Sequence, residues 1–440
     1  MVLTVASRRP GTPLAGARVA RQDDPRSCRR RWRAACGRPG VCRVGGACHA
    51  ARMARATSAG DRPVHAPVPV DRATVLRHRV RVQQLDRPAG SVTDVTDAAV
   101  LDAGVQDTGP DGALWALALR GVAVHAADRP ASLAYAWSVR GAPHAYRRDD
   151  LRDVERALRP WSDADAAKRL FDAARPLRAA GIAPTQALAA TARAMHAVVA
   201  HRLVKGEVST ALTAAMPEPY LRACRPCGTT HVYEQTFRLA ALHAGLELEP
   251  GTSPPVLRRI SRWPSSQVAR TEPTPPGAPH DLVRTALHLL GPADPALVAH
   301  LLDAPVREVA ARWPVDVVDV DVEGRTRQVL VEDLDALRSA ATGTSEPTVR
   351  LLGPYDLFLQ ARDRDLLVPE AVAQRTLWPV LGRPGAVVVD GDPVGTWRPR
   401  ARAGTVALDI TTWGRWSRDV RDRVAEQHEL LAAFRGLRTP

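Results

Sequence analysis

The chain has 440 residues, of which 45% are hydrophobic and 25% are charged. This length accommodates about three domains of roughly 150 residues and is ample for a sizeable core. The composition excludes a collagen-like chain, a disulfide-stabilised miniprotein and a chain that is disordered throughout. No run of about 18 apolar residues occurs, so we expect no transmembrane helix and no membrane partner.

The net charge of +14 is concentrated near the N-terminus. Residues 1–60 hold 13 Arg and two acids, a net of +11, which leaves +3 for the other 380 residues. The only lysines are Lys168 and Lys205, and we attribute the Arg excess to codon bias rather than to selection for phosphate binding. Any nucleic-acid surface must therefore be a local patch.

Residues 1–62 mix Arg, Ala, Gly and Pro without a hydrophobic period of 2 or 3.6. We predict a disordered basic extension, because the segment cannot bury enough apolar surface to offset its ordering entropy. It is either a basic arm that contacts DNA or an over-long reading frame whose true start is at or near Met53. The segment is not a secretory signal, because no apolar stretch of 7–15 residues follows a basic start, so a reducing compartment is expected. Its four cysteines have no zinc-site spacing: Cys28, Cys36, Cys42 and Cys48.

Residues 71–120 have the apolar spacing of three helices. The first has Asp71 as its N-cap and ends before Pro88. The third follows Pro110 and buries one face. The second helix is predicted at Asp94–Ala103 and the third at Leu114–Arg120. The buried face of the third helix is expected to carry Trp115 and Leu119.

Residues 151–250 are Ala-rich and predict further helices, with a turn at Lys205-Gly206-Glu207. The Pro-rich stretch Thr271–Pro276 indicates a linker.

The clearest architecture lies in residues 279–335, where three short helices precede a β-hairpin. Gly291-Pro292 stops the first helix and Asp294 caps the second. Gly324 supplies the positive φ of a tight turn. This order of elements is the winged-helix arrangement, and a generic helical domain with one hairpin is the alternative. The predicted elements are helices Pro279–Leu290, Pro295–Leu302 and Val306–Trp313, then strands Val315–Val322 and Arg325–Val331.

The C-terminal part is rich in β-strand patterns. Asp390-Gly391 is a strong turn signal between two apolar strands, and Trp397 is expected in the core. The predicted elements are strands Ala386–Val389, Val394–Arg398 and Thr405–Thr412, followed by an amphipathic helix, Val420–Phe434.

Four phrases together resemble the winged-helix DNA glycosylases that unhook interstrand crosslinks, the AlkZ-like and YcaQ-like proteins. Each phrase is weak alone, but the four occur in the family's order over about residues 70–415. They are Gly104-Val-Gln-Asp-Thr-Gly-Pro110, Trp137-Ser-Val-Arg-Gly-Ala-Pro-His144, Gly353-Pro-Tyr-Asp-Leu357 with Arg362-Asp-Arg364, and Val388-Val-Asp-Gly-Asp-Pro-Val-Gly-Thr-Trp-Arg398.

The resemblance implies an α+β fold of tandem winged-helix (helix-turn-helix) domains followed by a C-terminal β-barrel-like domain. The pattern analysis by itself gives one clear winged helix, one plausible one and the β-rich end. The expected segments are a disordered extension (1–62), winged helix 1 (63–150), a helical or winged-helix region with the linker (151–272), winged helix 3 (273–345), and the barrel-like domain with its terminal helix (346–440).

The resemblance places the active motif of the family, Gln-x-Gln or Gln-x-Asp, at Gln106-Asp107-Thr108. A carboxamide can position water, because its oxygen accepts and its nitrogen donates hydrogen bonds. Thr108 departs from the family pattern, which puts catalysis in doubt. Asp107 is the functional acid if the backbone is shifted. Alternatively, Asp107 and Thr108 end or cap helices and Gln106 is a polar residue at the edge of the core.

The resemblance also places His144, which follows Arg140-Gly141, in a hairpin that approaches the DNA backbone or the lesion; the alternative is a surface histidine. Arginines near the C-terminal strands are the expected phosphate contacts, and the alternative is a solvated face. The DNA-binding candidates are His144, Arg140, Arg362, Arg364, Arg375, Arg383, Arg398, Arg400 and Arg402.

Cys224-Arg-Pro-Cys227 and His231 offer three metal ligands, whereas a structural zinc normally has four. The simpler interpretation is a tight turn with two partly buried thiols. We therefore expect no metal and no other cofactor.

Two function hypotheses remain open from the sequence. The first is a DNA glycosylase that excises N7-alkylated purines and unhooks interstrand crosslinks. The second is a non-catalytic winged-helix DNA-binding protein, either a regulator or an inactive relative. Both imply a double-stranded DNA partner, and we expect a monomer in the cytoplasm, associated with the nucleoid. A scaffold that binds no DNA is a third, weaker reading that the near-neutral body allows.

Overall fold

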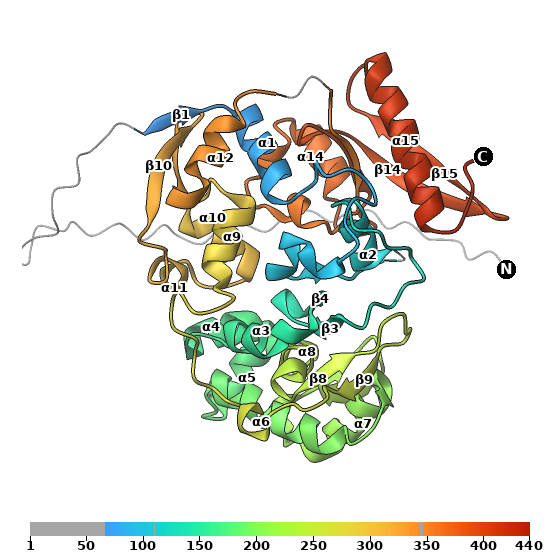
Figure 1. Ribbon diagram of the computed structural model, residues 1–440. Helices are drawn as coiled ribbons and strands as arrows, with labels where there is room; N and C mark the ends of the chain where they lie inside the picture. The colour runs from blue at the N-terminus through green and yellow to red at the C-terminus, as the bar shows by residue number, and fades with distance from the viewer. Residues whose placement is uncertain (1–66, 110, 344–345) are drawn as a thin grey trace, which may run out of the picture. The chain divides into compact units, whose positions relative to one another are not determined.

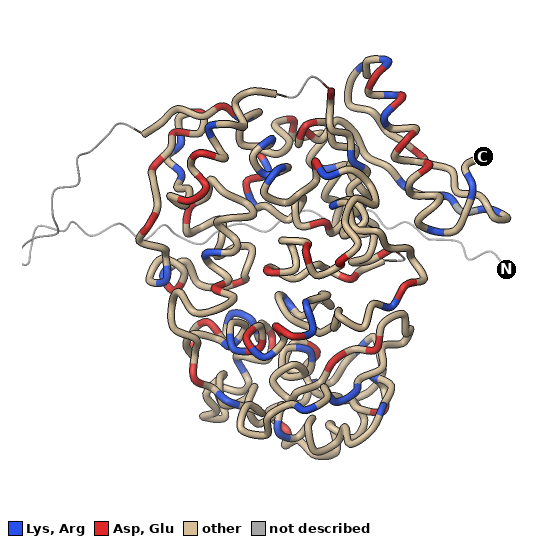
Figure 2. Tube along the Cα trace, in the orientation of Figure 1, with Lys and Arg blue, Asp and Glu red and all other residues tan. Residues whose placement is uncertain are grey.

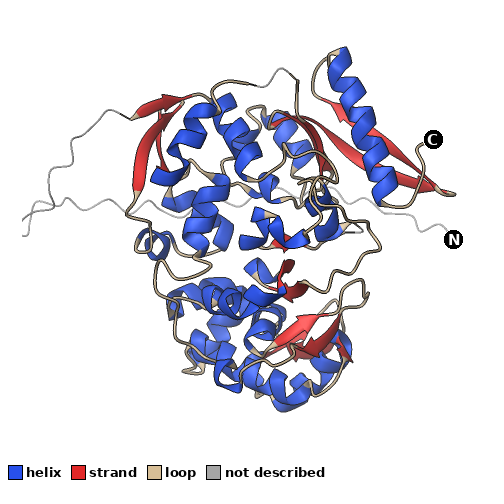
Figure 3. Cartoon of the chain, in the orientation of Figure 1, coloured by secondary structure: helices blue, strands red, loops and turns tan. Residues whose placement is uncertain are grey.

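The computed structural model describes residues 67–109, 111–343 and 346–440. The extension predicted at 1–62 lies outside the described residues, as does Pro110. The described residues mix helices with four sheets, which confirms the α+β class (Figures 1 and 3).

The first described elements are strand β1 (Val68–Val70) and helix α1 (Arg72–Val82). Asp71 caps α1 as predicted, because its carboxylate accepts a hydrogen bond of 2.6 Å from the backbone N–H of Thr74. Helix α2 (Gly112–Ala118) has the predicted length but begins and ends two residues earlier than predicted, and Trp115 and Leu119 are both buried as expected.

The prediction of a helix over Asp94–Ala103 is wrong. The segment forms two short 3-10 turns, Val95–Asp97 and Ala99–Asp102. The guanidinium of Arg147 binds the carbonyl oxygens of Thr96 and Ala98 at 2.6 and 2.9 Å. Those carbonyls are therefore directed to a side chain rather than to N–H groups of a further helical turn.

A six-stranded antiparallel sheet joins residues from two of the predicted segments. Its central hairpin is β3 (Leu133–Trp137) with β4 (Pro143–Arg147). The domain boundary predicted at residue 150 stays a prediction, but the hydrogen bonding of this sheet crosses it. The strand order is β2 (Val105–Gln106), β4, β3, β8 (Leu246–Leu248), β9 (Val256–Arg259) and β5 (Leu203–Val204).

The Ala-rich region is helical, as predicted. The turn expected at Lys205-Gly206-Glu207 is instead the first turn of helix α7, because the Glu207 carboxylate accepts from the Val204 N–H at 2.8 Å and caps the helix. A two-stranded hairpin, β6 (Leu221–Cys224) with β7 (Thr229–Val232), follows α7. The helices are α3 (Leu151–Leu158), α4 (Asp163–Leu170), α5 (Ala174–Ala179), α6 (Pro184–Val198), α7 (Lys205–Ala215) and α8 (Glu234–His243).

The predicted order of three helices and a hairpin is present after the linker. Glu323 and Gly324 have φ of 51° and 82°, the conformation of a two-residue turn between antiparallel strands. Strand β1 pairs in parallel with β10, so the start of the described chain completes this sheet. The elements are α9 (Leu282–Leu290), α10 (Pro295–Leu302), α11 (Val306–Ala310), β10 (Val317–Val322), β11 (Arg325–Leu330) and α12 (Leu334–Ser339).

The C-terminal sheet is an antiparallel meander in chain order. Asp390 and Gly391 form the predicted turn, with φ of 50° and 88°, and Trp397 is buried as predicted. The last helix packs against β12 and β15. The elements are β12 (Val349–Leu352), α13 (Arg364–Leu367), α14 (Ala371–Leu377), β13 (Gly385–Val389), β14 (Asp392–Arg402), β15 (Thr405–Thr412) and α15 (Arg418–Phe434).

Two buried Arg–Asp pairs connect the segment between β12 and α13 to the first helices. Arg120, at the end of α2, makes two hydrogen bonds of 2.8 and 2.9 Å to Asp356, and both side chains are fully buried. Arg79 of α1 pairs with Asp363 in the same two-pronged manner. The two hydrogen bonds in each pair offset the free-energy cost of burying both charges away from water.

Basic and acidic residues are interspersed along the described chain, in keeping with the small net charge of residues 61–440 (Figure 2). Among the described residues, no helix is both long and apolar enough to cross a membrane.

The buried pair predicts a large stability loss when one charge is removed. Asp356→Asn keeps the side-chain shape but leaves Arg120 as an uncompensated buried charge, so we expect a loss of roughly 3–5 kcal/mol in the free energy of unfolding. The matched control is Asp409→Asn, which breaks the exposed Arg400–Asp409 pair and is expected to cost less than about 1 kcal/mol. Denaturant titration measures both, and equal losses for the two variants would contradict this assignment.

Candidate functional site

Gln106 ends the short edge strand β2, directly opposite His144 of β4. The close packing of these strands depends on Gly104, which has a φ of +80°. A Cβ atom at this position would lie 2.4 Å from the ring of Tyr146. Only glycine fits such a position without displacing the tyrosine, so the first residue of the matched phrase sets the backbone path into Gln106.

A chain of hydrogen bonds fixes the amide of Gln106. The guanidinium of Arg140 donates to Gln360 Oε1 at 2.6 Å, and Gln360 Nε2 donates to Gln106 Oε1 at 2.8 Å. Gln106 Nε2 then donates to Thr108 Oγ1 at 3.0 Å. Because Arg140 only donates, each amide in the chain has one permitted orientation. Gln106 Oε1 keeps one lone pair that this chain does not use.

Asp107 points away from this chain of bonds. Its Oδ1 accepts from the Ala113 N–H at 2.9 Å, in the first turn of α2, and burial raises the pKa of its carboxyl. The backbone N–H of Asp107 donates to the Pro143 carbonyl and continues the pairing of β2 with β4. Asp107 is therefore placed as a cap of α2, while Gln106 and Thr108 share the opposite side.

His144 is buried, and its Nδ1 lies 3.0 Å from the carbonyl oxygen of Ala142 and 2.8 Å from Ser138 Oγ. Since a carbonyl only accepts, Nδ1 carries the hydrogen and Nε2 keeps its lone pair. Burial lowers the pKa of His144 to about 4, helped by the charge of Arg140. The imidazole is therefore neutral at physiological pH.

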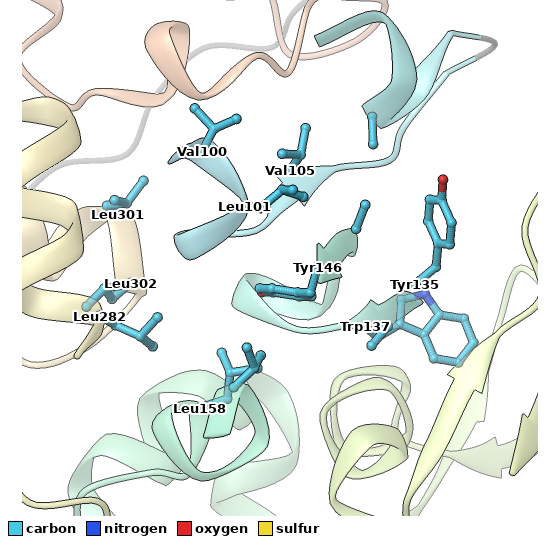
Figure 4. Close-up of a cluster of buried hydrophobic side chains, with 14 of the residues drawn as sticks. Val100, Leu101, Val105, Tyr135, Trp137, Tyr146, Leu158, Leu282, Leu301 and Leu302 are labelled. Carbon is cyan, nitrogen blue, oxygen red and sulfur yellow. The ribbon is translucent and has the colours of Figure 1, made fainter. Parts of the chain in front are cut away.

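Two hollows meet at Gln106. The first is lined by Gln106, Arg140, His144 and Gln360, with an apolar wall from α9 and α10. Figure 4 shows that wall, Leu282, Leu301 and Leu302, on one side of the cluster that also holds Tyr146. The second hollow runs from Gln106 and Thr108 to strand β14. Gln106 and Tyr355 line both hollows.

Four arginines converge beside these hollows. Burial, with a smaller contribution from the charges of Arg362 and Arg383, lowers the pKa of Arg140 to about 10. Burial and mutual repulsion also lower the pKa values of Arg362 and Arg364. Within the described residues, none of the four makes an ion pair with a carboxylate. Their guanidinium groups can therefore still bind an anion. Its members, called the arginine cluster below, are Arg140, Arg362, Arg364 and Arg383.

The other predicted DNA contacts lie outside this cluster. Arg400 pairs with Asp409, and a terminal nitrogen of Arg398 donates to the Gly382 carbonyl at 2.5 Å. Arg375 on α14 and Arg402 at the end of β14 are exposed. The structure thus brings four of the candidate arginines together and places the other four elsewhere, and their contact with DNA stays a prediction.

Sequence reasoning missed Gln360 and Tyr355. Gln360 is buried and hydrogen-bonds to both Gln106 and Arg140. The ring of Tyr355 lies under the guanidinium of Arg383, with 5.5 Å between the guanidinium carbon and the ring centre. The only sequence feature that could have indicated Gln360 is its place between Asp356 and Asp363, which both belong to the third of the four family phrases. Those two aspartates anchor the segment that carries Gln360 into the site.

The turn of Arg140 is held from α8. Arg140 has a φ of 58° and Gly141 a φ of 70°. Gln235 Nε2 donates to the Arg140 carbonyl at 3.3 Å, and an Arg238 terminal nitrogen donates to the Gly141 carbonyl at 3.2 Å. The direction of the Arg140 side chain thus depends on the first turns of a helix more than 90 residues away in sequence.

Away from these hollows, the structure brings Cys224, Cys227 and His231 together. Their ligand atoms lie within 4.8 Å of one another at the tip of the β6–β7 hairpin. Two partly buried thiols were expected, but Cys227 is exposed and only Cys224 is half-buried.

Comparisons with known proteins agree with this architecture. A family model described as DNA glycosylase AlkZ-like matches residues 95–434. Among solved structures, the Streptomyces sahachiroi DNA glycosylase AlkZ is similar, with 20% sequence identity and a TM-score of 0.62 over 85% of this chain and 99% of that chain. At this identity the likeness concerns the fold alone. No curated protein matches the chain.

The environment of His144 predicts an unusual titration. Its ring stays neutral as the pH falls through 6.5, the ordinary value for histidine, and takes up a proton only near pH 4. Two-dimensional NMR of the imidazole resonances, assigned by comparison with His144→Gln, measures this directly. A midpoint near pH 6.5 for the assigned ring would show that the burial argument is wrong.

Proposed function

The chain belongs to the AlkZ-like DNA glycosylase family, and we propose that it hydrolyses the N-glycosidic bond of N7-alkylated purines in double-stranded DNA, including purines held in interstrand crosslinks. The observation that carries this proposal is the hydrogen-bond chain that orients the Gln106 amide at the junction of two hollows. Asp107 has a separate role as a helix cap.

The chemistry asks little of the protein beyond positioning. Alkylation at N7 makes the base cationic and a good leaving group, so the reaction needs an oriented water and stabilisation of positive charge that develops on the sugar. Gln106 Oε1 has a lone pair left to accept from that water and presents a partial negative charge to the sugar. The neutral His144 ring, in the same hollow, offers Nε2 as a second acceptor.

Thr108 takes over part of the role of the second Gln or Asp in the family motif. Its hydroxyl accepts from Gln106 Nε2, which leaves its own hydrogen and a lone pair for water. A hydroxyl is shorter than a carboxamide and carries no charge, so we expect slower base release than a Gln at this position would give.

The arginine cluster supplies the contact with the DNA backbone. Partly buried guanidinium groups without carboxylate partners suit phosphate oxygens in geometry and charge. We further propose that the three helices α9, α10 and α11 with hairpin β10–β11 form a winged helix, and that tandem modules of this kind and the C-terminal, barrel-like sheet together clasp the duplex. A clasp of this kind lets bulky lesions react without full extrusion of the base.

The second candidate function is a DNA-binding relative that has lost the chemistry. The observation that favours it is Thr108, which departs from the family motif. DNA binding is common to both candidates, so only an assay of base release separates them.

Base release should depend on Gln106. Incubation of the full chain with duplex DNA carrying N7-methylguanine, or a nitrogen-mustard crosslink, should produce abasic sites that alkali cleaves. We expect Gln106→Ala to slow this release by about 100-fold, the effect of removing a preorganised polar group. Thr108→Val should slow it about 10-fold, because the hydroxyl is lost and the shape is kept.

The matched control is Gln186→Ala, an exposed glutamine on α6 that should leave the rate unchanged. Duplex binding by the wild-type chain without any base release would reject catalysis and leave the DNA-binding alternative. Thr108→Gln tests the cause of that outcome, because it restores the family motif.

Phosphate contact by the arginine cluster predicts a change in salt dependence. Removal of Arg362 or Arg364 by substitution with Ala should weaken binding to undamaged duplex and reduce the slope of log K against log salt by about 1 each. Arg400→Ala is the control, since Arg400 is paired with Asp409. Fluorescence anisotropy over a range of salt concentrations measures the slopes. Unchanged slopes in the cluster variants would place the DNA on another surface.

A further inference from the structure

The tip of the β6–β7 hairpin has the local construction of a metal clip. Strand β6 ends at Cys224, and the four-residue turn that follows contains Cys227 and closes at Gly228, which has a φ of 64°. Two cysteines separated by two residues are the commonest pair of zinc ligands, because their sulfur atoms converge across such a turn.

The third ligand comes from the returning strand. In the hairpin register Cys224 lies opposite Thr229, and His231 lies opposite Arg222. Positions two apart on paired strands point to the same face, so Cys224 and His231 share one side of the hairpin. The sequence spacing alone does not reveal this; the strand register brings the imidazole to the thiols.

The histidine is oriented as a ligand should be. His231 Nδ1 lies 2.7 Å from the carbonyl oxygen of Val232, which only accepts, so Nδ1 carries the hydrogen. The lone pair is then on Nε2, and a ring held by a backbone carbonyl in this way is the usual outer support of a zinc-binding histidine. The three ligand atoms lie within 4.8 Å of one another. In a tetrahedral zinc site they would lie roughly 3.5–3.8 Å apart, a contraction that side-chain rotation supplies.

We propose that Cys224, Cys227 and His231 bind one zinc ion, with water or another small ligand in the fourth position. Two thiolates and an imidazole in tetrahedral geometry select zinc among the common divalent metals. This proposal departs from our expectation of no metal, which rested on the count of ligands in the sequence. The proposal is independent of the glycosylase reaction.

With three protein ligands and an open fourth position this is not a closed structural zinc site, but the ion still fastens the hairpin close to helix α8. Only Val232 and Tyr233 separate His231 from α8, which begins at Glu234. The first turns of α8 hold the backbone of Arg140 and Gly141 through Gln235 and Arg238. A metal that fastens the hairpin therefore also fixes the start of the helix on which the Arg140 turn rests.

The test measures metal directly on the full chain, purified under reducing conditions. We expect one zinc ion per chain by mass spectrometry of the metal, and tetrahedral Co²⁺ absorption bands with thiolate charge transfer after substitution. Cys224→Ser with Cys227→Ser should abolish both signals. His231→Gln, which keeps both thiols, should weaken zinc binding in chelator competition by more than the roughly 10–100-fold of an outer-shell change.

The matched control replaces the four N-terminal cysteines, Cys28, Cys36, Cys42 and Cys48, with Ser and should retain the full zinc content. Circular dichroism establishes that each variant is folded. Zinc that disappears from this control and persists in the Cys224/Cys227 variant would overturn the proposal. So would a wild-type chain that takes up neither Zn²⁺ nor Co²⁺ while both thiols remain reduced.

Discussion

The candidate site depends on the two buried Arg–Asp pairs that fasten residues 353–364 to the first helices. Removing a charge from water is costly, and the cost is offset here only because each guanidinium meets its carboxylate through two hydrogen bonds. The pairs have little tolerance for displacement, so the intervening segment has a defined position. Gln360 lies on that segment and reaches Gln106 from the opposite wall. The amide of Gln106 is thus oriented through Gln360, whose position is fixed by ion pairs a few residues away from it on the same segment.

Electrostatics also explains why the site is built from neutral groups. Gln106, Thr108, Gln360 and a neutral His144 form a polar surface without formal negative charge, next to a cluster of arginines. A carboxylate in this position would pair with those arginines and reduce their attraction for phosphate. For the proposed substrate, which brings its own positive charge and is already a good leaving group, strong acid–base groups are unnecessary. In that proposal the roles are separated in space: the arginines contact the DNA backbone, and the amide and hydroxyl oxygens face the reacting bond.

The sequence predicted those parts of the molecule that local rules determine. The helix caps at Asp71 and Asp294, the turns at Gly324 and Asp390-Gly391, and the strand over Thr405–Thr412 follow from short-range chemistry and are confirmed. The family resemblance is also confirmed. Two of the failures have long-range causes. The Arg147 side chain hydrogen-bonds to carbonyl oxygens that a helix over Asp94–Ala103 would use for its own backbone. Gln360 hydrogen-bonds to Gln106, which lies 254 positions away in the sequence. No local pattern contains either contact. The winged-helix and barrel arrangement and the domain boundaries stay predictions.

The backbone at Arg140 has a consequence for how this residue can be replaced. A residue with a β-carbon at φ 58° carries a cost of order 1 kcal/mol or more, which glycine or asparagine would largely relieve. Either replacement would relieve that strain, and either would remove the guanidinium that starts the hydrogen-bond chain to Gln106 and leave the buried Gln360 oxygen without this donor. The backbone strain at Arg140 and the orientation of the two amides are therefore coupled, and a chain that relieved the first in this way would lose the second.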